Sequence, residues 1–293
     1  MNYNLDDALK TLEHMKQRAS CRSFLDKPIP KDLLKNIIET GLTAASGGNL
    51  QPISIIVIED KEDRKKLREI NSNQKFIEDA PVNLLFVLDF HKMGIYAKSE
   101  KAPYTCHKSY MHYLIGIEDV VCMAQVIETA AHLCGLGSCY VGTVNFTGDE
   151  HIKHFNLPEK TFPVLMLSLG YPKGELAIRK KLDYDIMVFD GKYPDLKDEE
   201  IIAAYTEKYK DARMPLPPNE EFKKERLDKF KEALLTSYSK EEADDIIKKA
   251  SELGFITETQ RRFGLHYHAN DMLDLSKSIM QMMKDNDLNS FQK

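Results

Sequence analysis

One short segment constrains the fold of this chain more than any other. Residues 82–89 are apolar except at Asn83 and Asp89. An almost unbroken apolar run of this length is typical of a strand that is buried on both faces of a sheet. The fold must therefore place other elements, most simply helices, against both sides of this strand.

Helical and strand patterns alternate around this segment. Three more strands are predicted, at residues 53–59, 138–144 and 163–169. Helical periodicity fills the intervals, at residues 5–17, 31–44, 61–70, 74–80, 117–133 and 149–155. This order predicts an α/β fold with a central sheet of about four to five strands flanked by helices.

Two regions depart from this pattern. Residues 91–113 read as less regular and are rich in Tyr and His, which predicts either a lid or substrate wall, or a loop packing on its own aromatic rings. After Tyr184 the charge rises, and helices are predicted at 196–210, 219–235, 239–253 and 269–285. We therefore expect a core domain over residues 1–185 and a helical C-terminal extension over residues 186–293, which is either a cap over the core or dimer, or a partner-binding module.

Composition excludes several functional classes. The 293 residues are 42% hydrophobic and 30% charged, as in a globular protein. The net charge of −5, with both signs interspersed, argues against a nucleic-acid partner. Apolar runs are shorter than the roughly twenty residues of a membrane-spanning helix, and the N-terminal segment lacks the apolar core of a signal peptide.

Cysteine and histidine usage predicts neither a disulfide framework nor a metal site. There are five cysteines, an odd number, and no Cys-x-x-Cys. A reducing cytoplasm is therefore expected, with Cys134 and Cys139 as small buried residues. Two histidine pairs have no carboxylate or thiolate partners at a recognisable spacing: His151 with His154, and His266 with His268.

Residues 44–52, Ala-Ala-Ser-Gly-Gly-Asn-Leu-Gln-Pro, lie between a predicted helix and a predicted strand. The glycines can adopt positive φ and expose backbone N–H groups, and Pro52 opens the strand. By itself this stretch fits an ordinary helix-to-strand turn as well as a ligand site.

Residues 18–24, Arg-Ala-Ser-Cys-Arg-Ser-Phe, offer two guanidinium groups and two hydroxyls within a short span. Arg binds phosphate oxygens through its planar fork of donors, and Ser adds neutral donors. The alternative is a solvated basic face at the end of the first helix.

Taken together, these two segments resemble motifs of the nitroreductase family of FMN-dependent oxidoreductases. Residues 134–142, with Gly135-Leu136-Gly137-Ser138, and residues 163–172 resemble the family's later motifs in the same order. The resemblance covers about residues 14–185, with Ala45 and Tyr140 in place of the family's usual Pro and Trp. It implies the family's α+β fold. A dinucleotide fingerprint is excluded, because the glycines precede a strand instead of opening a helix.

The resemblance also implies which residues bind FMN. Arg18 and Ser20 match positions that hold the phosphate and ribityl chain, and Arg22 matches the cation near the N1/O2 edge of the ring. Gly137 and Ser138 match the loop under the ring. The segment contacting the flavin from the partner subunit corresponds to Ser46, Gly47, Asn49 and Gln51. The basic pair that closes on the phosphate corresponds to Arg179, with Lys181 as second choice, although a solvated linker explains that run equally simply.

The resemblance therefore implies a homodimer with FMN at the subunit interface. It would pass electrons from NADH or NADPH to a nitroaromatic, quinone or similar acceptor by a ping-pong mechanism. The motif residues form no Cys/His or Ser/His/Asp constellation, so the flavin carries the chemistry and no protein side chain is expected to be catalytic. Two alternatives stay open: a specialised flavin enzyme of the same fold, of the dehalogenase or flavin-breakdown type, and a non-catalytic flavin-binding protein.

Overall fold

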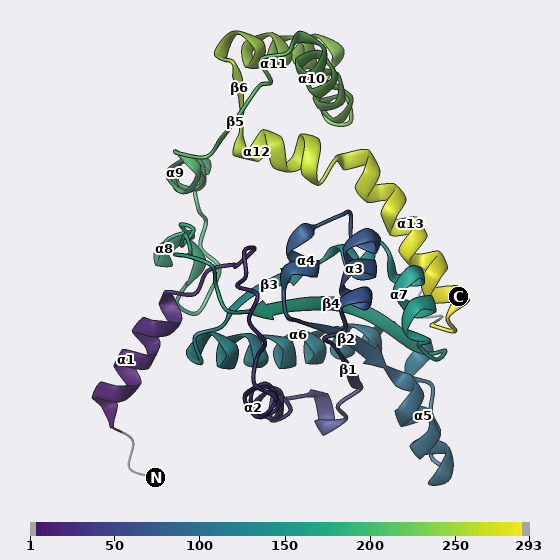
Figure 1. Ribbon diagram of the computed structural model, residues 1–293. Coiled ribbons are helices and arrows are strands. Elements are labelled where there is room, and N and C mark those ends of the chain that lie inside the picture. The colour runs from purple at the N-terminus through teal and green to yellow at the C-terminus, as the bar shows by residue number, and fades with distance from the viewer. Residues whose placement is uncertain (1–3, 289–293) are drawn as a thin grey trace. The chain divides into compact units, whose positions relative to one another are not determined.

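The computed structural model describes residues 4–288, which form two compact units. The first unit contains residues 4–178 together with 278–288, and the second contains residues 179–277. Figure 1 labels their elements. The sequence analysis placed a single boundary near residue 185, whereas the structure has a second division at residue 277, because the end of the last helix packs with the first unit.

Eleven labelled elements build the continuous part of the first unit. They are α1 (Leu5–Lys16), α2 (Lys31–Gly41), β1 (Ile53–Ile58), α3 (Lys61–Ile70), α4 (Lys75–Asp79), β2 (Val82–Asp89), α5 (Phe90–Ser99), α6 (Tyr110–Leu133), β3 (Gly137–Val141), α7 (Gly148–Phe155) and β4 (Thr161–Gly170). Short 3-10 turns lie between some of them, including Gly47–Asn49.

The sheet has the strand order β1-β2-β4-β3, and every neighbouring pair is antiparallel. β2 is buried along its whole length. Leu84, Phe86 and Leu88 pack with α2 and α6, whereas Leu85 and Val87 pack with α3 and α4 on the other face. Figure 1 shows these helix pairs on opposite sides of the sheet. The predictions of a doubly buried strand and of a helix-flanked sheet are therefore confirmed.

Residues 91–113 are more regular than expected, and the prediction of an irregular stretch was wrong for most of them. α5 begins directly after β2, because the Asp89 carboxylate accepts a hydrogen bond from the Lys92 N–H and caps the helix. The Ser109 hydroxyl caps α6 in the same way by accepting from the His112 N–H. The starts of α5 and α6 are thus set by N-terminal capping residues and not by a periodic apolar pattern. A lid function for this region stays a prediction.

The second unit contains the remaining elements and has its own core. They are α8 (Tyr184–Met187), α9 (Asp198–Tyr209), β5 (Arg213–Pro215), α10 (Glu220–Leu234), α11 (Lys240–Leu253), β6 (Phe255–Thr257), α12 (Glu258–Arg261) and the first part of α13 (Ala269–Asp285). Phe230 on α10 is buried in this core. β5 and β6 pair as an antiparallel two-stranded ribbon, which the sequence analysis missed.

The methionines at the end of α13 belong to the core of the first unit. Met282 and Met283 are both buried there, in the cluster that includes residues of α6. A side chain at Gly148, the first residue of α7, would collide with the Met282 sulfur, so the two helices approach closely at that point. The C-terminal end of the extension therefore stabilises the core domain.

His151 on α7 is expected to make the stability of the fold depend on pH. The side chain is fully buried, its Nδ1–H donates to the Thr147 carbonyl at 2.8 Å, and its Nε2 accepts from the Asn71 amide at 3.1 Å. These partners assign a neutral ring, and burial lowers the pKa of His151. Below about pH 6.5 the unfolded chain therefore binds more protons than the folded chain. The free energy of unfolding thus decreases as the pH is lowered.

We expect His151→Gln to reduce this acid dependence while lowering stability at neutral pH, since glutamine cannot reproduce both hydrogen bonds. Urea unfolding measured at several pH values between about 5 and 8 gives the slope. His14→Gln, on the exposed face of α1, is the control. An unchanged slope in His151→Gln would show that other groups cause the acid sensitivity.

Candidate cofactor site

Residues 18–22, called here the Arg-Ser-Arg segment, run in an extended conformation beside β3. Ser20 pairs with Ser138 in a parallel bridge, and the Cys21 N–H donates to the Ser138 carbonyl at 2.7 Å. Side chains of an extended chain alternate between its two sides. Accordingly Ala19 and Cys21 are buried, whereas the polar residues of the segment, Arg18, Ser20 and Arg22, are half-buried or exposed. The three polar residues that could donate to a phosphate are thus the solvent-accessible ones.

A buried carboxylate that the sequence analysis missed orients this segment. Glu128 on α6 is only 1% exposed, and its Oε1 accepts from Arg18 Nε at 2.7 Å and from Ser138 Oγ at 2.6 Å. Gln125 donates to the other carboxylate oxygen at 2.9 Å. The signal was present, because Glu128 is the charged residue in an otherwise uncharged helical stretch, residues 120–131.

Gly137 is required for the close approach of the two backbones. A Cβ at this position would lie 2.6 Å from the Cys21 Cβ, which is closer than side chains tolerate. Arg22 is exposed, and its guanidinium lies 5.9 Å from the centre of the Phe76 ring. The structure therefore brings together five of the predicted residues: Arg18, Ser20, Arg22, Gly137 and Ser138.

Residues 46–51, called here the amide segment, form a strained turn after α2. Gly48, Asn49 and Gln51 all have positive φ, at 57°, 56° and 49°. Conformations of this kind cluster at ligand sites, because the surrounding structure must hold them in place. The Gly47 N–H donates to Asp119 Oδ1 on α6 at 2.8 Å, and this tether was also missed from the sequence.

In the part of the chain that the structure describes, two polar atoms in or next to the amide segment lack a hydrogen-bond partner. They are the Ser46 hydroxyl and Asp119 Oδ2, and both are buried. Buried polar groups are nearly always hydrogen-bonded, so each unpaired one requires an explanation. Ser46, Gly47, Asn49 and Gln51 therefore lie together in a turn with unused hydrogen-bonding capacity.

The two segments lie at opposite ends of the sheet. The Arg-Ser-Arg segment adjoins the start of β3, beside the end of β4 at Gly170, whereas the amide segment leads into the start of β1, beside the end of β2 at Leu88. β2 and β4 are antiparallel, so these two strand ends are opposed. With about 3.3 Å per residue along β2, the ends are separated by on the order of 20 Å.

The contacts of the two segments with α6 also show that the segments lie far apart. Asp119 holds the amide segment and Glu128 holds the Arg-Ser-Arg segment. The two carboxylates are about two and a half helical turns apart, which puts them on opposite faces of α6 and separates them by about 13 Å along its axis. One chain therefore presents the two sets of predicted residues in different directions.

The third predicted group, Arg179 and Lys181, lies at the start of the second unit. Both side chains are exposed. Lys180 between them forms an ion pair with Glu207 of α9, within that unit. Phosphate binding by Arg179 and Lys181 stays a prediction.

Thiols near the Arg-Ser-Arg segment are not activated. Burial raises the pKa of the Cys21 and Cys139 thiols, so both stay protonated at neutral pH. The expectation for Cys139 is confirmed, but Cys134 is exposed rather than buried, because it follows α6 where the chain turns away toward β3.

Among the helices of residues 4–288, none has the length and apolar character that are needed to span a membrane.

Comparisons with known proteins agree with the fold and with the motifs. The sequence profile of the nitroreductase family matches residues 15–171. A Cr(VI) reductase of Pseudomonas sp. strain G-1 is 29% identical over 67% of this chain and 80% of its own length. An NAD(P)H-dependent FMN reductase of Bacillus subtilis is 30% identical over 68% of this chain and 80% of its own.

A solved structure extends the similarity beyond the core. It is a candidate oxidoreductase from Bacteroides fragilis, 25% identical, with a TM-score of 0.75 over 94% of this chain and 99% of that one. The helical extension is therefore found in another protein of the same fold. Because the profile matches more than half of the sequence and the fold agrees, the chain belongs to the nitroreductase family.

Proposed function

We propose that the protein is an FMN-dependent oxidoreductase that takes a hydride from NADH or NADPH and passes electrons to a small acceptor such as a nitroaromatic or a quinone. The observation that carries the proposal is the solvent access of Arg18, Ser20 and Arg22 along an extended segment that is bridged to Ser138. When bound, FMN supplies hydride acceptance and the storage of two electrons, which side chains cannot provide.

The residues present fit the cofactor. Arg18, oriented by Glu128, and the Ser20 hydroxyl would bind the phosphate and ribityl chain. The exposed Arg22 would stabilise negative charge on the reduced ring. Gly137 and Ser138 would support the ring through their backbone, and Arg179 and Lys181 would close on the phosphate in a further proposed contact.

The unpaired Ser46 hydroxyl supports a flavin contact by the amide segment, although this segment lies far from the Arg-Ser-Arg segment of the same chain. Both segments can serve one cofactor if each site combines the Arg-Ser-Arg segment of one chain with the amide segment of another. We therefore propose a homodimer with two sites at the subunit interface.

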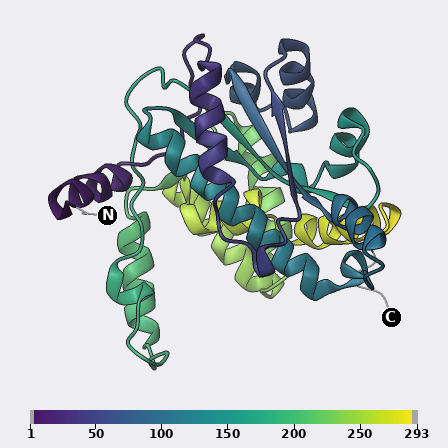
Figure 2. The same cartoon turned by 90° about the horizontal axis from the view of Figure 1, so that it is seen from below.

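Exposed apolar helix faces support association. On α1 none of the residues is buried, and four apolar side chains recur every three or four positions on one face: Leu5, Leu9, Leu12 and Met15. On α6 Tyr110, Leu114 and Val121 are also exposed along one face. Figure 1 and Figure 2 both show α1 projecting from the rest of its unit. Exposed apolar side chains gathered on one helix face are a feature of surfaces that pair with another protein.

Anaerobic titration of the FMN-loaded protein with NADH and with NADPH tests the function. We expect the visible flavin absorbance to bleach rapidly with at least one of them, and added quinone or nitroaromatic to restore it. An alternating cycle of this kind gives ping-pong kinetics, with parallel double-reciprocal lines. If the flavin stays oxidised with both nucleotides, the non-catalytic flavin-binding alternative is favoured.

A cytoplasmic location, expected from the cysteine content, stays a prediction.

A further inference from the structure

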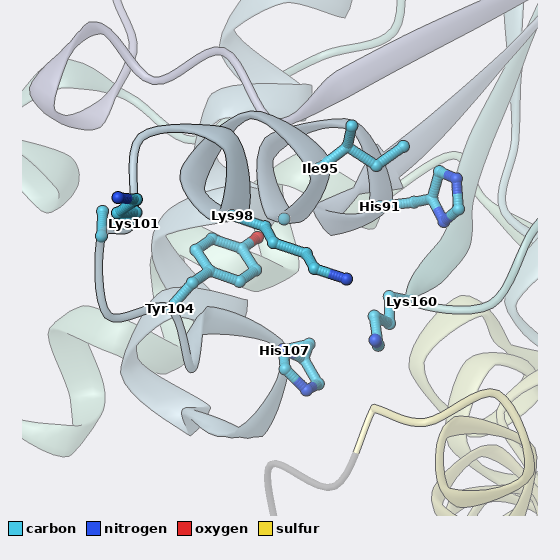
Figure 3. A pocket seen from close by; sticks show the side chains of 9 residues that line it. His91, Ile95, Lys98, Lys101, Tyr104, His107 and Lys160 are labelled. Atoms are coloured by element: carbon cyan, nitrogen blue, oxygen red, sulfur yellow. The ribbon is translucent and has the colours of Figure 1, made fainter.

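A pocket separate from the proposed FMN contacts opens between α5, the loop that follows it, and the residue before β4. Its volume is about 510 Å³. Figure 3 shows the side chains of His91, Lys98, His107 and Lys160 around one opening. The full lining is His91, Gly94, Ile95, Lys98, Lys101, Ala102, Tyr104, His107 and Lys160. None of the residues assigned to FMN lines it.

The pocket carries an excess of positive charge. Three lysines and two histidines line it, without a carboxylate among the lining residues. Two of these residues pair with Asp287, whose Oδ2 lies 3.5 Å from Lys160 Nζ and 3.8 Å from His107 Nε2. Within residues 4–288, neither Lys98 nor Lys101 forms an ion pair. Two ammonium groups are thus left without a negative partner.

His107 provides a second and independent observation. Its side chain is only 9% exposed, yet its Nδ1 has no hydrogen-bond partner among the described residues. The ring is fixed, because it stacks on Tyr104 at 5.9 Å and the Tyr104 hydroxyl donates to the Phe90 carbonyl at 2.9 Å. A buried nitrogen without a partner is unfavourable, and a ligand that hydrogen-bonds to it would offset this cost.

We propose that this pocket binds a small anion that carries a phosphate group. Lysine ammonium groups suit a multiply charged oxyanion, and Nδ1 in its N–H form can donate to the same group. The volume exceeds the needs of free phosphate, and Gly94, Ile95 and Ala102 form an apolar part of the wall. The phosphate group therefore comes either from the free ion or from a mononucleotide. The proposed site shares no residue with the proposed FMN contacts.

Equilibrium dialysis with radiolabelled inorganic phosphate tests the proposal. The full-length protein is saturated with FMN beforehand, so that phosphate cannot occupy the flavin sites. We expect saturable binding of one phosphate per chain. Lys98→Gln combined with Lys101→Gln should weaken it at least tenfold, because each lost charged contact contributes about 1.5 to 3 kcal/mol.

The matched control is Lys65→Gln combined with Lys153→Gln, which makes the same change in net charge at exposed positions outside the pocket. Competition with adenosine 5′-monophosphate and with adenosine identifies the source. Stronger displacement by the nucleotide than by unlabelled phosphate indicates a mononucleotide, and weaker displacement indicates the free ion. No saturable binding, equal affinity in the two double variants, or displacement by adenosine as strong as by the nucleotide would overturn the proposal.

Discussion

Two inactive variants of this chain are expected to restore activity when they are combined in one dimer. One chain carries Ser20→Ala and Arg22→Ala, and the other carries Asn49→Asp and Gln51→Glu. If each site joins the Arg-Ser-Arg segment of one chain to the amide segment of the other, the heterodimer has one intact and one doubly damaged site. About half of wild-type activity should return, because the two sites of a symmetric dimer are equivalent.

These substitutions spare the architecture of the site. Arg18 is kept because it pairs with the buried Glu128. Asn49 and Gln51 have positive φ, so exchanges that preserve side-chain size remove the amide donors at the least cost to the backbone. The measurement is NADPH oxidation by heterodimers isolated through two different affinity tags.

A rearrangement of the same four substitutions is the control. With all four on one chain and none on the other, a shared-site heterodimer has two half-damaged sites and should be inactive. Sites contained within one chain would reverse the outcome, because the unmodified chain would then be active and the first combination would be dead. Reversal of this kind would contradict the shared site.

Arg18→Ala is expected to lower both FMN affinity and stability. The lost contact to phosphate should weaken FMN binding roughly 10- to 150-fold, as expected for a charged hydrogen bond of about 1.5 to 3 kcal/mol. Removal of Arg18 also leaves Glu128 buried without its cation. Because the Arg18 side chain is 31% exposed, the loss of stability should be smaller than the roughly 3 to 5 kcal/mol of a fully buried pair. Flavin fluorescence quenching measures the first effect, and urea unfolding of the FMN-free protein measures the second.

The double variant Arg18→Ala with Glu128→Gln separates the two effects. A neutral amide can still accept from Ser138 without a buried charge, so stability should recover in part. FMN affinity should stay low, because the guanidinium is absent. Recovery of affinity together with stability would show that Arg18 acts only as a structural partner of Glu128 and does not contact the phosphate.

Much of the fold could be predicted because local patterns and tertiary packing agree. The apolar segment 82–89 became β2 with the expected bounds, and α3 (Lys61–Ile70) matches its prediction to the residue. The prediction failed for residues 91–113, where capping by Asp89 and Ser109 decides the helices and the apolar pattern is weak. The β5–β6 ribbon was missed because its two short strands lie far apart in the sequence.

The site could be predicted in part. Motif order identified Arg18 and Ser138, and the structure places them on the same carboxylate. The isolated charge of Glu128 is visible in the sequence, but its partners and the role of Asp119 are not, because they come from other elements that meet only in the fold. Sequence spacing also could not reveal that the two segments lie at opposite ends of the sheet, since this depends on strand order.

The position of the Arg-Ser-Arg segment also has a consequence for solubility. β3 is the last strand of the sheet, and an uncovered outer strand exposes N–H and C=O groups that can recruit strands from other molecules. The hydrogen bond from Cys21 to Ser138 covers part of that border. The segment that is proposed to hold the cofactor thus also reduces the exposed edge at which other molecules could pair with the sheet and aggregate. A substitution that loosens them, such as Gly137→Val, would be noticed first as protein lost to the insoluble fraction.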